Sequence, residues 1–203
     1  MNMKRGMKLC AAAFALFCLA LGSFVLFFPW EASGRLGGIL LRERLAPRGV
    51  SLSWRNIESS GMGNFRILDP GMALPMATLE MRECDLLPRW GESLRRFAGI
   101  LDISFGPGEL RVFGKSLSWS GGSGRIVCER GVVHIFSFRS AGEFRAQGDC
   151  SFSLETRRFL KASIAIRVPP EKDQLFAPLQ GFLPLRKGEE PGQWFLERKE
   201  GTS

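Results

Sequence analysis

The sequence predicts a mainly β protein, in which an N-terminal transmembrane helix precedes an antiparallel β-meander with two or three short flanking helices. Three observations predict this class. Residues 9–28 carry no charged side chain, apolar and polar residues alternate in short runs after residue 50, and glycine-rich turns separate those runs. Such alternation is typical of a sheet with one apolar and one wet face. We expect the meander to form a curved sheet or half-barrel.

Composition narrows the class of protein before any motif is considered. The chain has 203 residues and a formal net charge of +8. This length suits one domain with a targeting segment. The basic residues are spread over separate segments, such as Arg95/Arg96 and Arg157/Arg158, whereas a nucleic-acid-binding surface would be a clustered stripe. We therefore expect a solvated basic surface and no nucleic-acid partner.

Residues 9–28 predict a transmembrane signal anchor, because 20 helical residues span the roughly 30 Å of a bilayer's hydrocarbon core. A cleavable signal peptide has a shorter apolar core. Ala20-Leu21-Gly22 could be its cleavage site, but cleavage would leave the apolar residues 23–28 as a new N-terminus. An uncleaved anchor is the preferred interpretation, and cleavage is the alternative. The residues assigned to the anchor are Leu9, Phe14, Leu16, Phe17, Leu19, Leu21, Phe24, Val25, Leu26, Phe27, Phe28 and Trp30.

The charges before this segment predict its orientation. Lys4, Arg5 and Lys8 precede it without any acidic residue, and the positive-inside rule keeps such residues in the cytoplasm. The rest of the chain is then expected outside the cytoplasm after a single pass. The predicted organisation is a cytoplasmic basic region (1–8), the anchor (9–28), a juxtamembrane helix or linker (29–48), an exported β-rich domain (49–198) and a polar tail (199–203).

Local patterns predict the elements in order. Helical spacing from Ser33, a possible N-cap, predicts a helix over 33–45, which Pro47 ends. Further short helices are expected at 89–97 and 173–179. Residues 132–138 are apolar on both faces, which is typical of a central strand. Alternating runs predict strands within 50–55, 101–105, 116–120, 144–147, 150–155 and 161–168, with turns at 106–108, 121–124, 130–131, 141–142 and 148–149.

One face of this sheet is expected to be apolar. It is either an ordinary core or a partly open trough that holds an acyl chain or a partner strand. Both interpretations need the same alternation, so the sequence leaves them open. The residues assigned to this putative groove or core face are Leu101, Ile103, Leu117, Trp119, Phe144, Phe152, Ile164 and Ile166.

Motifs for catalysis are not found, and we expect no enzymatic activity, no metal and no cofactor. The segment from Gly108 to Gly114-Lys115-Ser116 resembles a phosphate-binding loop, but it has five residues between the glycines and continues as a strand. The lone His134 is interpreted as a hydrogen-bonded strand residue. Asp102, Asp149 and Glu155 fall on wet strand faces and are expected to be solvated. Cys84, Cys128 and Cys150 lack metal-ligand spacing, so they are either buried thiols or include one disulfide.

The order of segments resembles that of a known family. The segments that carry the resemblance are Val50-Ser51-Leu52-Ser53-Trp54, Gly63-Asn64-Phe65-Arg66-Ile67, the run from Gly142 to Gly148, Phe182-Leu183-Pro184-Leu185 and Gly192-Gln193-Trp194-Phe195-Leu196. After an N-terminal anchor and a short helix, this order resembles type II secretion system protein N (GspN). It is also similar to the wider group of AsmA-like periplasmic β-groove proteins. The resemblance covers roughly residues 8–198.

The resemblance implies a place and a role. It implies a single-pass protein of the bacterial inner membrane, with the β-rich domain in the periplasm. There the protein would be an accessory component of type II protein secretion, a structural subunit that contacts other secretion subunits rather than an enzyme. The AsmA-like relatives imply an alternative, in which the apolar groove binds lipid or transfers it between the membranes. Neither family implies a catalytic or metal-binding residue in this chain.

Overall fold

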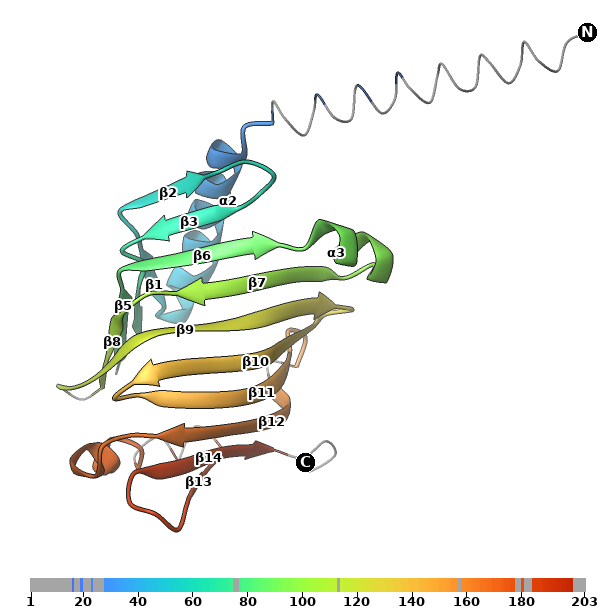
Figure 1. Ribbon diagram of the computed structural model, residues 1–203. Coiled ribbons are helices and arrows are strands. Elements are labelled where there is room, and N and C mark those ends of the chain that lie inside the picture. Colours follow the sequence, from blue (N-terminus) through green and yellow to red (C-terminus); the bar gives the residue numbers. More distant parts are fainter. Residues whose placement is uncertain are drawn as a thin grey trace, which may run out of the picture.

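The computed structural model describes residues 16, 19, 23, 28–74, 77–112, 114–156, 158–177, 180 and 184–198. In these ranges 14 strands form a single open sheet, and all of the strand pairs are antiparallel (Figure 1). The mainly β, antiparallel class is therefore confirmed. In chain order the elements are α2 (Trp30–Leu45), η1 (Ala46–Arg48), β1 (Ser51–Ser53), β2 (Asn56–Ser59), β3 (Phe65–Leu68), β4 (Gly71–Leu74), β5 (Ala77–Met81), β6 (Glu83–Pro88), α3 (Trp90–Arg96), β7 (Gly99–Phe105), β8 (Gly108–Val112), β9 (Lys115–Glu129), β10 (Val132–Gly142), β11 (Arg145–Ser153), β12 (Arg158–Arg167), η2 (Pro170–Leu175), β13 (Leu185–Lys187) and β14 (Gln193–Arg198).

The transmembrane helix in the predicted fold class is wrong for the described structure. No helix in the described ranges is long and apolar enough to cross a membrane. The long helix α2 begins only at Trp30, and its sequence WEASGRLGGILLRERL has charged residues near both ends, which breaks the apolar run that a span requires. Most of residues 9–28, together with Lys4, Arg5 and Lys8, lie outside the described residues. Of the residues assigned to the anchor, the structure describes Leu16, Leu19, Phe28 and Trp30.

The sheet forks at its longest strand, β9. One edge of β9 pairs with β8 along its first part and with β7 along its second part. From β8 the sheet continues to β5, β4 and β1, whereas from β7 it continues to β6, β3 and β2. The other edge of β9 pairs with β10, and β11, β12, β14 and β13 follow (Figure 1). The predicted meander therefore holds for β9 to β12, and the fork was not predicted.

Two predicted turns are wrong, because their glycines lie inside strands. Gly122 is in β9 and Gly148 is in β11. A Cβ on Gly122 would overlap the ring of Phe105, and a Cβ on Gly148 would overlap the carbonyl oxygen of Ser163 on β12. Glycine inside a strand often marks such a close approach. Because these two glycines lack a Cβ, the Phe105 ring and the Ser163 carbonyl group can pack directly on the backbone. The glycines are therefore packing positions inside strands and do not form turns.

The short helices and the central strand agree with the sequence. Helices α2 and α3 occupy two of the regions where helices were expected, although α2 begins three residues earlier. The third, η2, is a 3-10 helix over Pro170–Leu175, so it overlaps the expected range 173–179 only at 173–175. The apolar segment 132–138 lies in β10, between β9 and β11. A bulge at Ser137, which has φ 51°, interrupts its register. The bulge leaves the preceding Phe136 42% exposed.

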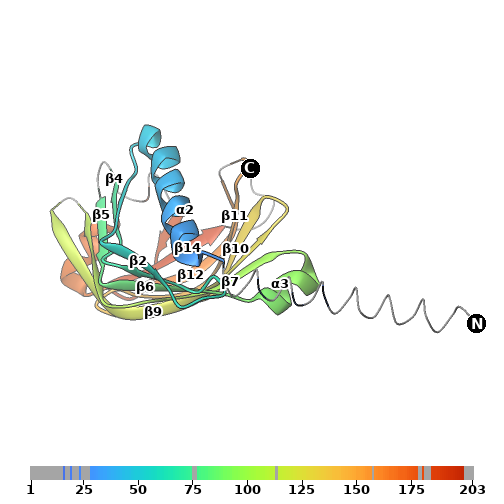
Figure 2. The ribbon, with the colours of Figure 1, turned by 90° about the horizontal axis from the view of Figure 1, so that it is seen from above.

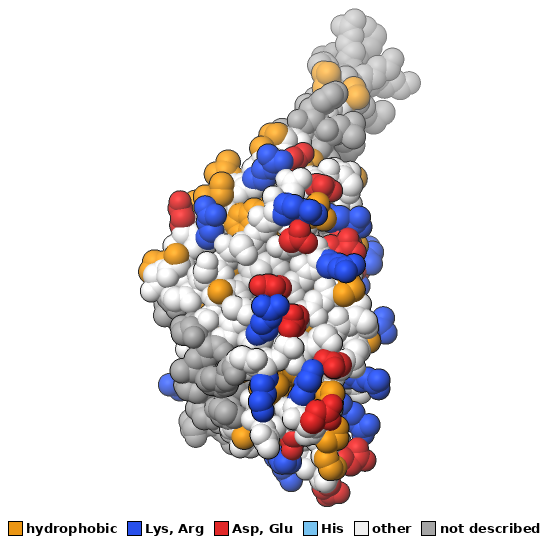
Figure 3. Space-filling view, turned by 90° about the vertical axis from the view of Figure 1, so that its left-hand side faces the viewer, with side chains coloured by type: hydrophobic (Ala, Val, Ile, Leu, Met, Phe, Trp, Pro, Cys, Tyr) orange, Lys and Arg blue, Asp and Glu red, His pale blue; other side chains and the backbone are white. Residues whose placement is uncertain are grey.

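The two faces of the sheet differ in polarity, as the register shows. The apolar side turns its concave surface towards α2 (Figure 2), where Gly34 of α2 lies on Phe65 of β3. The opposite side is here called the outer face. It carries the charged residues that lie in the centre and at the right of Figure 3. One row across the apolar face contains Leu86, Ile103, Gly124, Phe138, Gly148, Ile164 and Leu196. The neighbouring row on the outer face contains Asp85, Ser104, Ser123, Arg139 and Gln147.

The main core lies in the C-terminal half of the sheet, where η2 and the β13–β14 hairpin contribute to it. The ring of Phe176, just after η2, stacks on Phe144 and on Trp194, with centroid distances of 6.5 and 5.7 Å. The core cluster contains Val112, Leu117, Ala146, Cys150, Ala162, Ile166, Val168, Leu175, Phe176, Leu185, Trp194 and Leu196.

Candidate functional site

The structure distributes the eight predicted face residues between a closed and a more open part of the apolar face. Leu117 and Ile166 belong to the core cluster, against which Phe144 and Ile164 pack. Trp119 is buried beside Phe105, outside that cluster. The remaining three, Leu101 and Ile103 on β7 and Phe152 on β11, are half-buried and belong to no core cluster among the described residues.

Helix α2 packs through its glycines on the part of the apolar face formed by β2 and β3. A Cβ on Gly34 would lie 2.6 Å from the ring of Phe65, and a Cβ on Gly38 would lie 3.0 Å from the ring of Trp54. The guanidinium of Arg42, one turn further, lies 5.7 Å from the centre of the Trp54 ring. Residues at i, i+4 and i+8 share one side of a helix. The glycine side of α2 is therefore its sheet side.

The leucines of α2 consequently point elsewhere. Leu36 is 60% exposed and Leu40 is 54% exposed, and helical geometry places both on the side away from Gly34 and Gly38. Ile39 and Leu41 are also more than 40% exposed, and α2 has no buried residue. A surface helix normally turns its apolar side to its own protein, and α2 does the reverse. Helix α2 thus presents apolar side chains to solvent on the side away from its sheet contact.

The outer face contains a broad hollow of about 1400 Å³, lined by residues of α3 and of strands β6, β7, β9, β10, β11, β12 and β14. Asp102, Arg125, Arg139, Asp149 and Glu197 are among the charged residues that line it. Their positions follow from strand alternation, since each is one residue away from a side chain on the apolar face.

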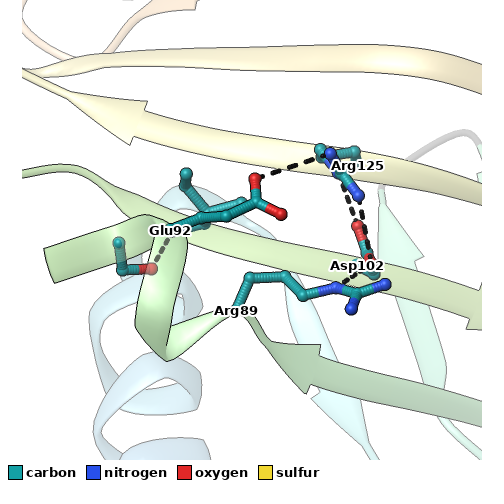
Figure 4. Close-up of polar contacts among 6 residues, drawn as sticks. Arg89, Glu92, Asp102 and Arg125 are labelled. Carbon is teal, nitrogen blue, oxygen red and sulfur yellow. Dashed lines mark hydrogen bonds and ion pairs between the residues drawn. The ribbon is translucent and has the colours of Figure 1, made fainter. Parts of the chain in front are cut away.

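Asp102 is the centre of an ion-pair network in this hollow (Figure 4). Its carboxylate accepts hydrogen bonds from Arg125 Nε at 2.7 Å and from Arg89 Nε at 2.5 Å. Arg125 also lies 3.8 Å from Glu92 of α3. The hydrogen bond from Arg125, followed by that from Arg89, holds the pKa of Asp102 below its ordinary value. The network ties α3 to β7 and β9, and it neutralises charges that would otherwise be available to a ligand.

Sequence reasoning missed this network, because it treated Asp102 as a solvated strand residue. The sequence contains only a weak signal for this network. Asp102 and Arg125 both fall on wet strand faces, but their contact depends on the pairing of β7 with β9, which places them opposite each other. The expectation for His134 is confirmed, because its Nδ1 lies 2.8 Å from Ser151 Oγ on the paired strand β11.

The three cysteines in the described part of the chain are free thiols, so the disulfide alternative is not found there. Burial raises the pKa of Cys84 to about 11 and also raises the pKa of Cys150, whereas Cys128 is exposed. Within the described ranges, no group of His, Cys, Asp and Glu side chains could hold a metal ion.

Comparison with known proteins gives one family. A family model described as "Type II secretion system protein GspN-like, Synergistales" matches residues 6–198. This range includes α2 and every strand of the described sheet. No curated protein sequence matches the chain.

Proposed function

The chain belongs to the GspN-like family of type II secretion system proteins, and we propose that it acts in secretion as a structural and interaction subunit rather than as an enzyme. The observation that carries the proposal is the inverted packing of α2, which turns glycines to the sheet and leaves leucines exposed on the side away from it. We take the occupant of this side to be another subunit of the same secretion system, because the family supplies such partners.

The energetics of burial support a protein partner here. Each Å² of apolar surface removed from water contributes about 25 cal/mol. Leu36 and Leu40 are both more than half exposed, and the apolar face of the sheet also includes the half-buried Leu101 and Ile103. A partner that packs against the leucine side of α2 would remove that apolar surface from water. Glycines at 34 and 38 keep the helix close to one branch of the sheet and leave the rest of the concave side free.

The proposal that the protein is not an enzyme rests on the hydrogen bonds of two carboxylates on the outer face. The carboxylate best placed for chemistry there, Asp102, is held by two arginines. Asp149 accepts a hydrogen bond from the backbone N–H of Ser137 at 2.6 Å, where it fixes the bulge of β10. Acidic groups engaged in this way stabilise a fold, whereas a general acid or base needs contact with a substrate. Location at the inner membrane stays a prediction, which cell fractionation would test.

Site-specific crosslinking in cells tests the proposed function. A photo-crosslinking amino acid at Leu40 should capture other subunits of the secretion system. The same amino acid at Lys161, an exposed residue of β12, is the matched control and should capture far less. If both positions give the same products, or if Leu40 gives none from the secretion system, the proposed interaction surface is wrong.

The half-buried concave face also favours a second candidate function, the binding of lipid. Leu101, Ile103 and Ile164 lie on one side of the sheet and are partly accessible, as an acyl chain would require. This function predicts about one phospholipid per purified chain by mass spectrometry, and loss of that lipid in the Ile103→Asp variant. Lipid at background level in the wild-type protein would exclude this second function and leave the structural and interaction role as the proposed function.

A further inference from the structure

The tip of the molecule formed by α3 and the residue after it, Phe97, exposes three large apolar side chains. Phe97 is 95% exposed, Leu94 is 74% exposed and Trp90 is 46% exposed. Trp90 and Leu94 stand at positions i and i+4 and therefore share one side of the short helix, and Phe97 follows at its C-terminal end. The three exposed side chains lie within eight consecutive residues, which distinguishes them from scattered single residues.

The backbone of Phe97 adds an independent observation. Phe97 ends α3 in the left-handed conformation, with φ 51° and ψ 39°. Glycine or asparagine usually occupies such a cap, because a side chain with a Cβ has an energetic cost there. Phe97 has this cost, yet its ring is almost wholly in water. A strained residue whose side chain contributes so little inside the fold points to a contact made outside it.

Basic charge lies next to these rings. Arg95 and Arg96 form the last turn of α3, and neither makes an ion pair within the described part of the chain. The acidic residue of the helix, Glu92, faces Arg125 of β9 instead. Apolar rings beside unpaired arginines suit the interfacial zone of a bilayer, where rings enter the acyl boundary and guanidinium groups bind phosphates.

The position of α3 in the chain fits the same environment. The ring of Trp90 lies 6.0 Å from that of Trp30, which in turn lies 4.6 Å from that of Phe28. Trp90 Nε1 donates a hydrogen bond to the carbonyl oxygen of Met62, which fixes the ring. Residues 9–27, which lead to Phe28, contain no charged side chain. The tip is therefore adjacent to the end of the most apolar stretch of the sequence.

We propose that α3 and Phe97 form a contact site for the surface of a bilayer that contains anionic phospholipid. Trp90, Leu94 and Phe97 enter the interfacial zone, and Arg95 and Arg96 bind the lipid phosphates. The proposal does not depend on the partner of α2, because the two surfaces belong to different elements and use different residues.

Site-specific fluorescence on the full chain tests this site. An environment-sensitive dye is attached to Leu94→Cys in a chain whose Cys10, Cys18 and Cys128 are replaced by serine; Cys84 and Cys150 are buried and remain. The protein is combined with vesicles of phosphatidylglycerol and phosphatidylcholine that carry a lipid-borne quencher. The dye at 94 should be quenched severalfold more than the same dye at Glu171→Cys on η2, at the opposite end of the molecule (Figure 1).

Charge reversal separates a lipid surface from a protein partner. Because each arginine near an anionic surface favours binding about fivefold, Arg95→Glu with Arg96→Glu should reduce the quenching, as should vesicles of phosphatidylcholine alone. Circular dichroism of the double variant checks that it folds. Three outcomes would each overturn the proposal. The first is equal quenching at 94 and 171, and the second is quenching that is unchanged in the charge-reversal variant. The third is a dye at 94 that responds only to added secretion subunits.

Discussion

The two halves of the sheet bury their apolar faces to very different extents. In the C-terminal half, residues 108–198, twelve residues form one core, in which Leu117 is 1% and Trp194 is 2% exposed. In the N-terminal half, residues 30–105, the buried hydrophobic residues among those described are Ile57, Cys84, Ala98 and Ile100. The alternating pattern is the same in both halves, so alternation alone does not determine whether an apolar face becomes a core.

The difference comes from what covers each half. In the C-terminal half, the segment after η2 inserts Phe176 between Phe144 and Trp194, and Trp194 is held by a hydrogen bond to Asp173 at 2.6 Å. In the N-terminal half, α2 contributes glycines at its contact with the sheet. A covering segment with large side chains produces a core, whereas one with glycines leaves a surface. The C-terminal half therefore contains the main core, whereas the proposed interaction surface lies in the N-terminal half.

The largest effect expected from this comparison concerns leucine-to-aspartate exchanges. Leu117→Asp places a carboxylate in the core and should cost about 4 kcal/mol or more, so the domain should be unfolded or strongly destabilised. Leu36→Asp on α2 should change the free energy of unfolding by less than about 0.5 kcal/mol, because the side chain is exposed. Thermal unfolding followed by circular dichroism measures both. Similar melting temperatures would contradict the division into two halves.

Two glycine-to-alanine exchanges are expected to give the next largest difference in the free energy of unfolding. Gly148 in β11 has φ 147°, and a Cβ there would overlap the backbone of β12, so Gly148→Ala should destabilise the protein by about 2 kcal/mol or more. A Cβ on Gly37 of α2 would meet nothing within 4 Å. Gly37→Ala should therefore stabilise the helix by up to about 1 kcal/mol. Urea unfolding gives both values, and a loss of stability in the alanine variant at 37 would show that α2 is more closely packed than described.

A smaller effect is expected from the network that joins α3 to the sheet. Asp102→Asn removes the charge that Arg125 and Arg89 share and should lower the free energy of unfolding by about 1 kcal/mol. The loss should shrink at high salt, because the network is partly exposed and therefore screened. Urea midpoints at two salt concentrations measure it. Glu129→Gln, at an exposed and long ion pair of 3.7 Å, is the matched control.

The smallest effect is a pH dependence in the C-terminal half. Hydrogen bonds from Lys172 and then Ser118 lower the pKa of Glu143 from 4.5 to about 2. A carboxylate with a lowered folded-state pKa stabilises the protein above its unfolded value and loses that contribution as pH falls from 4.5 towards 2. Glu143→Gln should flatten this part of a plot of melting temperature against pH. An unchanged slope would show that the ion pair adds nothing measurable, as exposed pairs often do.

The parts of the fold that follow from local pattern could be predicted, and those that depend on strand partners could not. The alternation of Leu101 and Ile103 with Asp102 predicts the two faces of β7. The fork at β9 could not be predicted, because nothing in the sequence of β9 indicates that β7 and β8 share one edge of it. Gly122 and Gly148 indicate turns by local pattern alone, because the groups that overlie them belong to other strands of the sheet. In α2, helical spacing predicted the helix but not which side meets the sheet.

The fork in β9 also affects how copies of the protein behave towards one another. A simple sheet has two outer strands, whereas this sheet has three, β1, β2 and β13, each only three or four residues long. Short outer strands are poor templates for strand-by-strand addition of another chain. The fork therefore adds an outer strand to the described sheet, but the shortness of all three limits strand-by-strand addition of neighbouring molecules.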